Sequence, residues 1–203
     1  MPERARQLYA AAVDLFLERG YREVDVDDIV VNCNLSRGTF YGSYRNKRDL
    51  LDVILARSFD DLTAAVFDDS DWSAVHDLDA FVAEFRAQLR RAFQYIADNA
   101  KLLSFVILAA PGVDAEALST LLAGYRSISA KQSEVLAFAA QRGWMRSDVE
   151  IDVALAGQLV VSCVATAASP LLLGTGEEFD VDEAARVCGD YLLGGMNALL
   201  PAS

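Results

Sequence analysis

Residue types on which many enzymes and metal sites depend are scarce in this chain. The 203 residues include one histidine, His76, and three cysteines, Cys33, Cys163 and Cys188, which are far apart and form no Cys-x-x-Cys pair. Neither a zinc ribbon nor a disulfide framework is therefore predicted. A Gly-x-Ser-x-Gly elbow, a Walker loop and a histidine-rich pattern are all missing. We expect a protein that is not an enzyme, with no metal and no cofactor.

Basic residues are also few compared with acidic ones. Eighteen Lys and Arg stand against 30 Asp and Glu, for a net charge of −12, which argues against a general nucleic-acid coat protein. The imbalance is local: residues 1–57 hold nine basic and nine acidic residues, whereas residues 58–203 hold nine basic and 21 acidic ones. This asymmetry suggests two segments with different tasks.

Targeting signals are not evident. The amino-terminal residues lack a basic head followed by an apolar run, so no signal peptide is predicted. Residues 153–176 carry no charge and are long enough to span a bilayer, but acidic residues flank them and no Lys or Arg lies close by. We interpret this segment as a buried helix that ends at Pro170. A cytoplasmic protein without a membrane span is expected, in keeping with the few, scattered cysteines.

No segment shows a sustained alternation of apolar and polar residues with a period of two, so no sheet is predicted. Apolar residues recur at helical spacing almost throughout, which predicts an all-α fold of about nine helices. The first 46 residues are expected to form a small helix-turn-helix domain, and residues 47–203 a larger helical bundle joined to it through the helix that starts near residue 47. The longer helices of the bundle are predicted at 78–98, 101–110, 114–141, 151–169 and 181–199.

The segment 25–44 has the outline of a helix-turn-helix motif. Asp25 and Ser36 are good N-caps for two short helices, and Asn34 between them tolerates the left-handed conformation of a tight turn. No acidic residue occurs between Ile29 and Arg48, where four basic residues gather. In the second short helix, predicted from Arg37 to about residue 43, the Phe40 and Tyr44 rings are spaced to point inward. The opposite face then presents hydroxyl, small and basic groups suited to phosphates and base edges.

Here the sequence resembles the amino-terminal domain of the tetracycline-repressor (TetR) family over about residues 4–57. Ser36-Arg37-Gly38-Thr39-Phe40-Tyr41, followed six residues later by Lys47, is its most specific part. The other matching residues are Gly20-Tyr21, Asp25-Val26-Asp27-Asp28-Ile29, Leu35, Tyr44, Asn46 and Asp49-Leu50-Leu51.

The resemblance implies a homodimeric, sequence-specific DNA-binding regulator of transcription. Such a regulator, expected to be a repressor, binds a palindromic operator on double-stranded DNA and leaves it when a small molecule binds. Carried over by position, the Val26 backbone N–H would meet a phosphate, as would the Lys47 ammonium. The residues in or beside the major groove would be Arg37, Gly38, Thr39, Tyr41, Gly42 and Ser43.

Positions 42 and 43 depart from the family pattern. The family usually has an aromatic or histidine pair there, whereas this chain has Gly42-Ser43. The change removes bulk from the groove-facing surface, and a glycine in a helix interior costs about 1 kcal/mol. We therefore expect altered base readout and a weakened helix.

The resemblance also implies that residues 47–203 form a ligand-binding and dimerisation domain, which supplies the dimer interface and the effector pocket. The nearly uncharged helix 151–169 and helix 181–199, with its Gly194-Gly195 pair, are the interface candidates. An unknown small hydrophobic or amphipathic effector is expected to contact aromatic faces and a weakly polar stripe. The candidate ligand-binding residues are Phe81, Phe85, Phe93, Phe105, Tyr125, Gln158, Ser162 and Thr166.

Two other readings of the sequence stay open. A ligand-binding or scaffold protein could keep the helix-turn-helix fold without operator recognition, and Gly42-Ser43 favours this alternative. An all-helical enzyme is the second, although the single histidine and the lack of a nucleophile motif count against it.

Overall fold

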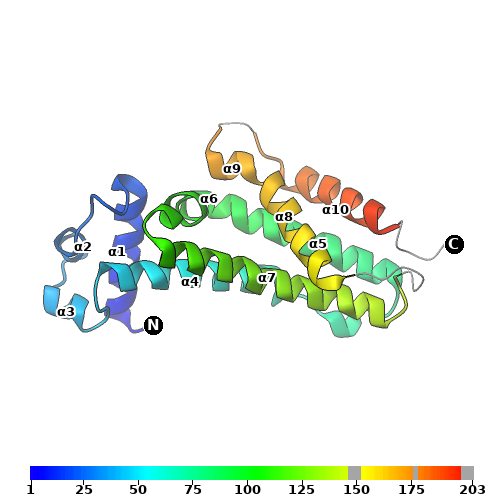
Figure 1. Ribbon diagram of the computed structural model, residues 1–203, viewed down its shortest axis with the longest axis horizontal. Coiled ribbons are helices and arrows are strands. Elements are labelled where there is room, and N and C mark those ends of the chain that lie inside the picture. Colours follow the sequence, from blue (N-terminus) through cyan, green and yellow to red (C-terminus); the bar gives the residue numbers. More distant parts are fainter. Residues whose placement is uncertain (146–151, 176–177, 198–203) are drawn as a thin grey trace. The chain divides into compact units, whose positions relative to one another are not determined.

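The computed structural model describes residues 1–145, 152–175 and 178–197 (Figure 1). In these ranges the chain forms ten α-helices and no strand, which confirms the all-α prediction. Short 3₁₀ and π segments connect some of the helices. The helices divide between two compact units, residues 1–60 with 101–124 and residues 61–100 with 125–203. The division of the chain at residue 46 into a DNA-binding and a ligand-binding domain stays a prediction.

The first unit contains the helix-turn-helix segment. Its α-helices are α1 (Glu3–Arg19), α2 (Val26–Asn32), α3 (Arg37–Tyr41), the first part of α4 (Lys47–Phe67), α6 (Ala100–Ser104) and the first part of α7 (Ala115–Gln141). Between α6 and α7 lie a π segment, Phe105–Ala109, and a 3₁₀ segment, Ala110–Gly112. The predicted helix 101–110 is thus a single turn of α-helix continued by two irregular turns.

Local signals place α2 and α3 as the sequence predicts. Asp25 and Asp28 form a reciprocal capping box at the start of α2, and the Ser36 hydroxyl accepts from the Thr39 N–H at the start of α3. Between them Asn34 adopts a φ of 52°, the left-handed conformation that its short polar side chain tolerates. The two helices are therefore joined by a tight turn, as expected.

The core of the first unit comes from apolar residues that recur at helical spacing on α1, α2, α3 and α4. Leu8, Phe16, Ile29, Phe40 and Leu50 are buried almost completely. Burying each such side chain contributes about 1.5–3 kcal/mol, which favours packing of the short helices against one another. The Phe16 ring also stacks on Phe105 from the π segment, at a centroid distance of 5.9 Å.

The second unit is built around the paired helices α5 and α10. It contains α5 (Leu78–Asp98), α8 (Val153–Ala167), α9 (Ser169–Leu173), α10 (Val181–Asn197), the later parts of α4 and α7, and the 3₁₀ turn η1 (Trp72–Ala74). Helix α10 packs extensively on α5 and also contacts α8. The predicted start of one helix at residue 151 and the predicted end of another at residue 199 lie outside the described residues.

Gly157 permits a very close approach between α8 and α7. A Cβ atom at this position would lie 2.3 Å from the Ser133 Oγ and 2.7 Å from the Ser129 carbonyl oxygen. The second of these contacts is with the backbone of α7, which cannot move aside cheaply. Helix α8 can pack at this distance only because residue 157 has no side chain.

The uncharged segment is two helices, which raises the helix count from the expected nine to ten. Helix α8 ends at Ala167, and Pro170 lies in the first turn of α9, which Gly174 closes with a φ of 63°. Proline is well tolerated at that position because the N–H it lacks would have no partner within the helix. Among the described helices, none has the length and apolar character needed to cross a membrane.

Candidate DNA-binding surface

The outer side of α3 carries most of the predicted DNA-binding residues. Phe40 and Tyr44 are buried on the inner side, and the Tyr44 hydroxyl donates to the Ala5 carbonyl oxygen at 2.9 Å. This bond ties the end of the motif to α1. The predicted residues left exposed are Arg37, Gly38, Tyr41, Gly42 and Ser43, while Thr39 is half-buried. The inward and outward faces of this helix are therefore as predicted.

Helix α3 is shorter than predicted, because it ends at Tyr41. Gly42 is its C-cap and donates its N–H to the Gly38 carbonyl oxygen at 3.0 Å, while the Ser43 hydroxyl donates to the Thr39 carbonyl oxygen at 3.2 Å. The expectation of a glycine inside the helix was wrong in its placement, since Gly42 lies at the helix end. The full interior penalty for glycine does not apply there. The pair Gly42-Ser43 thus forms a small, polar end to the exposed helix.

The Thr39 side chain is held in place by the cap of its own helix. Its hydroxyl lies 3.0 Å from the Ser36 hydroxyl, and the Thr39 backbone N–H donates to the same Ser36 oxygen at 3.1 Å. A side chain held in one orientation in advance loses less conformational entropy when it makes a new contact. The contact of Thr39 with a base stays a prediction.

The basic residues around α3 already have partners. Arg37 makes two hydrogen bonds to the Asp27 carboxylate of α2, and Arg45 pairs with Asp49 one helical turn away. Hydrogen bonds from the Arg37 guanidinium hold the pKa of Asp27 below its usual value. The local excess of positive charge expected from the sequence is therefore reduced by Asp27 and Asp49, which flank the stretch without acidic residues.

Arg48 is the most strongly paired of these cations. It donates to Asp52 at 2.6 Å and to Asp114, at the start of α7, at 2.6 and 2.9 Å. These hydrogen bonds lower the pKa of Asp114 to about 2 and raise the pKa of Arg48. Arg48 therefore links α4 to α7 within the first unit.

Lys47 has a structural position that sequence reasoning did not anticipate. Its ammonium donates to the Tyr21 carbonyl oxygen at 2.8 Å and to the Val24 carbonyl oxygen, and it lies 4.2 Å from the centroid of the Tyr21 ring. Burial lowers the pKa of Lys47. The side chain therefore holds the loop between α1 and α2 against the start of α4. Its predicted phosphate contact is not tested by these bonds, since an ammonium has three N–H groups.

Val26 is the first residue of α2, directly after its N-cap Asp25. The first N–H groups of a helix have no partner within the helix. The contact of the Val26 N–H with a phosphate stays a prediction. The capping box satisfies the N–H groups of Asp25 and Asp28.

The predicted ligand-binding residues do not gather in one place. Phe81, Phe85 and Phe93 are buried on α5, and Tyr125 is half-buried on α7, where burial raises its pKa. Phe105 belongs to the first unit and packs on Phe16. The polar stripe Gln158, Ser162 and Thr166 is exposed on the outer side of α8, together with Leu155 and Leu159. The stripe faces away from the core, so it does not extend the buried aromatic cluster within the protomer.

Two buried glutamines are functional candidates that the sequence analysis missed. Gln88 of α5 and Gln132 of α7 are buried to 2% and 4% exposure. Both side-chain polar atoms of Gln88 and the Gln132 Nε2 have no hydrogen-bond partner in the described structure. Leaving such a group unsatisfied costs about 1–3 kcal/mol. The available signal was a glutamine at a core position of an apolar helical face, between Phe85 and Leu89 in the case of Gln88.

Residues 8–54, which include this surface, match the family model of bacterial regulatory proteins, tetR family. This match identifies residues 8–54 as an amino-terminal domain of the TetR type. The match confirms the family resemblance inferred from α2 and α3, and it supports a DNA-binding regulator. No curated protein matches the chain.

Solved structures similar to this chain cover nearly all of it. The fatty acid degradation regulator FadR from Bacillus halodurans is 18% identical, with a TM-score of 0.80 over 97% of each chain. The regulator FadR from Bacillus subtilis, solved in complex with stearoyl-CoA, is 19% identical, with a TM-score of 0.73 over 94% of this chain and 98% of that chain. A TetR-like regulator from Rhodococcus sp. RHA1 is 18% identical, with a TM-score of 0.66 over 97% of this chain and 98% of that chain. At these identities the likeness establishes a common fold.

Proposed function

We propose that the protein is a homodimeric, cytoplasmic repressor that binds a palindromic operator and releases it when a small hydrophobic or amphipathic ligand binds. The observation that carries this proposal is the exposed face of α3. Capping by Ser36 and burial of Phe40 and Tyr44 fix the helix, so that Arg37, Tyr41 and their small neighbours face outward.

Binding to DNA would require some of the existing ion pairs to open. The Arg37–Asp27 pair is exposed on both sides, with side chains 65% and 48% exposed, and exposed pairs contribute only about 0–1 kcal/mol. A phosphate or a guanine edge can therefore compete with Asp27 for the guanidinium. By contrast, Arg48 is only 19% exposed and has two acidic partners, so we assign it to the fold and not to DNA contact.

Dimer formation is supported by an apolar surface on each of two helices. Leu155 and Leu159 on α8 are 52% and 59% exposed, and Val187 and Tyr191 on α10 are 48% and 74% exposed. We propose that a second copy covers these side chains, because large exposed apolar side chains that cluster are typical of interaction sites. The two DNA-binding segments of the dimer would have to lie about 34–36 Å apart, or a multiple of that distance, to meet successive major grooves.

A dimerisation test compares two leucines on different helices. We expect Leu159→Glu to produce monomers in sedimentation velocity at micromolar concentration. Leu122→Glu, a matched change at a similarly exposed leucine of α7, is expected to leave the dimer intact. Dimers with unchanged affinity in the Leu159 variant would remove α8 from the interface.

Ligand responsiveness is supported by the unpartnered polar atoms of Gln88 and Gln132. Buried polar groups are nearly always hydrogen-bonded, so groups without a partner indicate a place where a bound molecule or water completes the structure. The B. subtilis neighbour was solved in complex with stearoyl-CoA, an amphipathic molecule, which supports this part of the proposal.

Operator binding is tested by titrating the full-length protein onto the DNA upstream of its own gene, with a scrambled duplex of equal length as control. The proposal predicts preference for the native fragment, and a Thr39→Ala change is expected to reduce that preference. Equal, salt-sensitive binding to both duplexes would instead favour the alternative of a helix-turn-helix protein without operator recognition. The small Gly42-Ser43 end and the paired cations are the observations that favour this alternative.

A further inference from the structure

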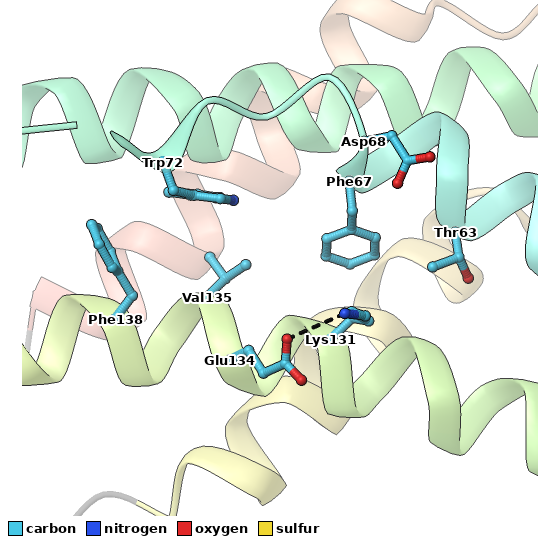
Figure 2. A pocket seen from close by; sticks show the side chains of 8 residues that line it. All are labelled: Thr63, Phe67, Asp68, Trp72, Lys131, Glu134, Val135 and Phe138. Atoms are coloured by element: carbon cyan, nitrogen blue, oxygen red, sulfur yellow. Dashed lines mark hydrogen bonds and ion pairs between the residues drawn. The ribbon is translucent and has the colours of Figure 1, made fainter. Parts of the chain in front are cut away.

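A pocket of about 340 Å³ lies in the second unit, between the end of α4, the turn after it and the later part of α7 (Figure 2). Its volume falls in the range of small-molecule sites, about 300–1,000 Å³. Neither the predicted ligand-binding residues nor the unpartnered glutamines line it. The lining residues are Thr63, Phe67, Asp68, Trp72, Lys131, Glu134, Val135 and Phe138.

Aromatic rings form much of the pocket wall. Phe67 reaches from the end of α4 toward α7, while Trp72 and Phe138 face each other from opposite sides with centroids 5.8 Å apart (Figure 2). The face of an aromatic ring carries negative electrostatic potential and attracts cations. The chain already uses one of these rings in this way, since the Arg142 guanidinium lies 4.6 Å from the Phe138 centroid.

The charged side chains that line the pocket also favour a cation, because acidic groups outnumber basic ones. Lys131 and Glu134 pair with each other on α7 at 3.4 Å (Figure 2). Asp68, which follows Phe67, makes no side-chain hydrogen bond or ion pair with the described residues. Two carboxylates and one ammonium leave a net charge of −1 on the lining, with Asp68 as the carboxylate available to a ligand.

We propose that this pocket binds a small organic cation with an apolar body, such as an aryl-alkyl quaternary ammonium. The aromatic rings would contact both the cation and the apolar part, and Asp68 would supply the opposite charge. The inference rests on the proposed function in one respect: the cation would be the small-molecule effector that releases the protein from its operator. Binding itself is measured without DNA, so its failure is distinguishable from a failure of operator recognition.

The test uses benzyltrimethylammonium as the probe and neopentylbenzene, which has the same shape without charge, as its neutral counterpart. Binding to the full-length protein is followed by calorimetry and by quenching of Trp72 fluorescence in a Trp144→Phe background. We expect the cation to bind at least tenfold more tightly than the neutral compound. Phenylacetate, an anion of similar size, is expected not to compete.

Three variants distinguish the proposed contacts. Asp68→Asn is expected to weaken cation binding at least fivefold, whereas Asp69→Asn, the same charge change at an exposed neighbour outside the lining, leaves it unchanged. Lys131→Gln is expected to strengthen cation binding or leave it unaltered. Equal binding of the cation and the neutral compound, or weaker binding of the cation after Lys131→Gln, would overturn the proposal.

A second inference comes from two cysteines on facing helices. The Cys163 Sγ of α8 lies 4.0 Å from the Cys188 Sγ of α10, and both thiols are free. Cys163 is half-buried and Cys188 is buried, and burial raises the pKa of the Cys188 thiol to about 11. Cys33, in the other unit, donates its thiol to the Ile29 carbonyl oxygen. The sequence separation of 25 residues gave no sign that two of the three cysteines meet.

We infer that hydrogen peroxide converts this pair into a disulfide between α8 and α10. The more accessible Cys163, as thiolate, attacks a peroxide oxygen; the O–O bond breaks, leaving a sulfenic acid and water. The Cys188 sulfur then attacks the Cys163 sulfur, the S–O bond breaks and a second water leaves. Two thiols thus lose two electrons and two protons, and one peroxide is reduced to two waters. Disulfide formation requires only that the distance between the two Sγ atoms shortens from 4.0 Å to about 2.05 Å.

Intact mass and thiol titration of the full-length protein test this step. After peroxide treatment the wild-type protein is expected to lose 2 Da and to fall from three titratable thiols to one, with a Cys163–Cys188 cross-linked peptide after digestion. Cys33→Ser is expected to behave in the same way, with two thiols falling to none. Cys163→Ser and Cys188→Ser are expected to form no intramolecular disulfide. Retention of all three thiols, or cross-linking through Cys33, would overturn the inference.

Discussion

Replacing Lys47 with methionine tests a side chain that has both a structural position and a predicted DNA contact. Methionine keeps an unbranched stem of similar length and removes the ammonium. The variant loses two hydrogen bonds, to the carbonyl oxygens of Tyr21 and Val24, and the contact with the Tyr21 ring. If Lys47 also meets a phosphate, the same change affects stability and DNA binding together.

The expected loss of stability follows from these contacts. A hydrogen bond from a charged group contributes about 1.5–3 kcal/mol, and a cation over an aromatic ring about 0.5–1 kcal/mol at an exposed site. Because Lys47 is half-exposed, water replaces part of this interaction in the variant. We therefore expect the free energy of unfolding to fall by about 1–2 kcal/mol. Urea unfolding followed by circular dichroism measures this change.

The DNA contact is measured separately, by operator affinity across a series of salt concentrations. Each phosphate contact contributes about −0.9 to the slope of log affinity against log salt, so loss of one contact per DNA-binding segment should reduce the slope of a dimer by about two. Arg45→Met is the matched control, since Arg45 is exposed and pairs only with Asp49 in the described structure. An unchanged unfolding free energy would refute the structural contacts, and an unchanged slope would remove Lys47 from the phosphate contacts.

Three further predictions concern packing, acid stability and base readout. Gly157→Ala should destabilise the fold by about 1–3 kcal/mol or more, as overpacking does, because its Cβ would clash with the backbone of α7. Gly194→Ala, where a Cβ meets open space, should be tolerated; equal melting temperatures for the two variants would contradict the close approach of α8 and α7. Asp114→Asn should reduce the fall in the free energy of unfolding that the wild-type protein shows between pH 4 and pH 2. The folded pKa of Asp114, about 2, is below its ordinary 3.8, so the carboxylate's contribution is complete above pH 3.8 and is lost as pH falls through 2. If the variant's free energy of unfolding falls as steeply with pH as that of the wild-type protein, the pairing of Asp114 with Arg48 is not the cause of the fall. Arg37→Ala should cost about 1–3 kcal/mol at a contacted base pair and relax the preference there, as operator variants assayed by gel shift would reveal; loss of affinity equal for every base would indicate a phosphate contact instead.

Features set within a few neighbouring residues could be predicted from the sequence. The caps at Asp25 and Ser36, the left-handed turn at Asn34 and the inward rings Phe40 and Tyr44 all depend on side chains that act within one or two helical turns. Helical periodicity likewise predicted α5 with its actual ends. These signals were enough to outline the candidate DNA-binding surface, because that surface is a single short helix and its caps.

Contacts between distant segments were decided by the tertiary structure. The sequence alone determined an all-helical chain with an outward-facing helix near its amino end. It could not show that Lys47 binds the carbonyls of the loop before α2, that Gln158 faces outward, or that Cys163 meets Cys188. Helical periodicity identifies which face of a helix is apolar, but the neighbour that covers that face depends on how all the helices pack together.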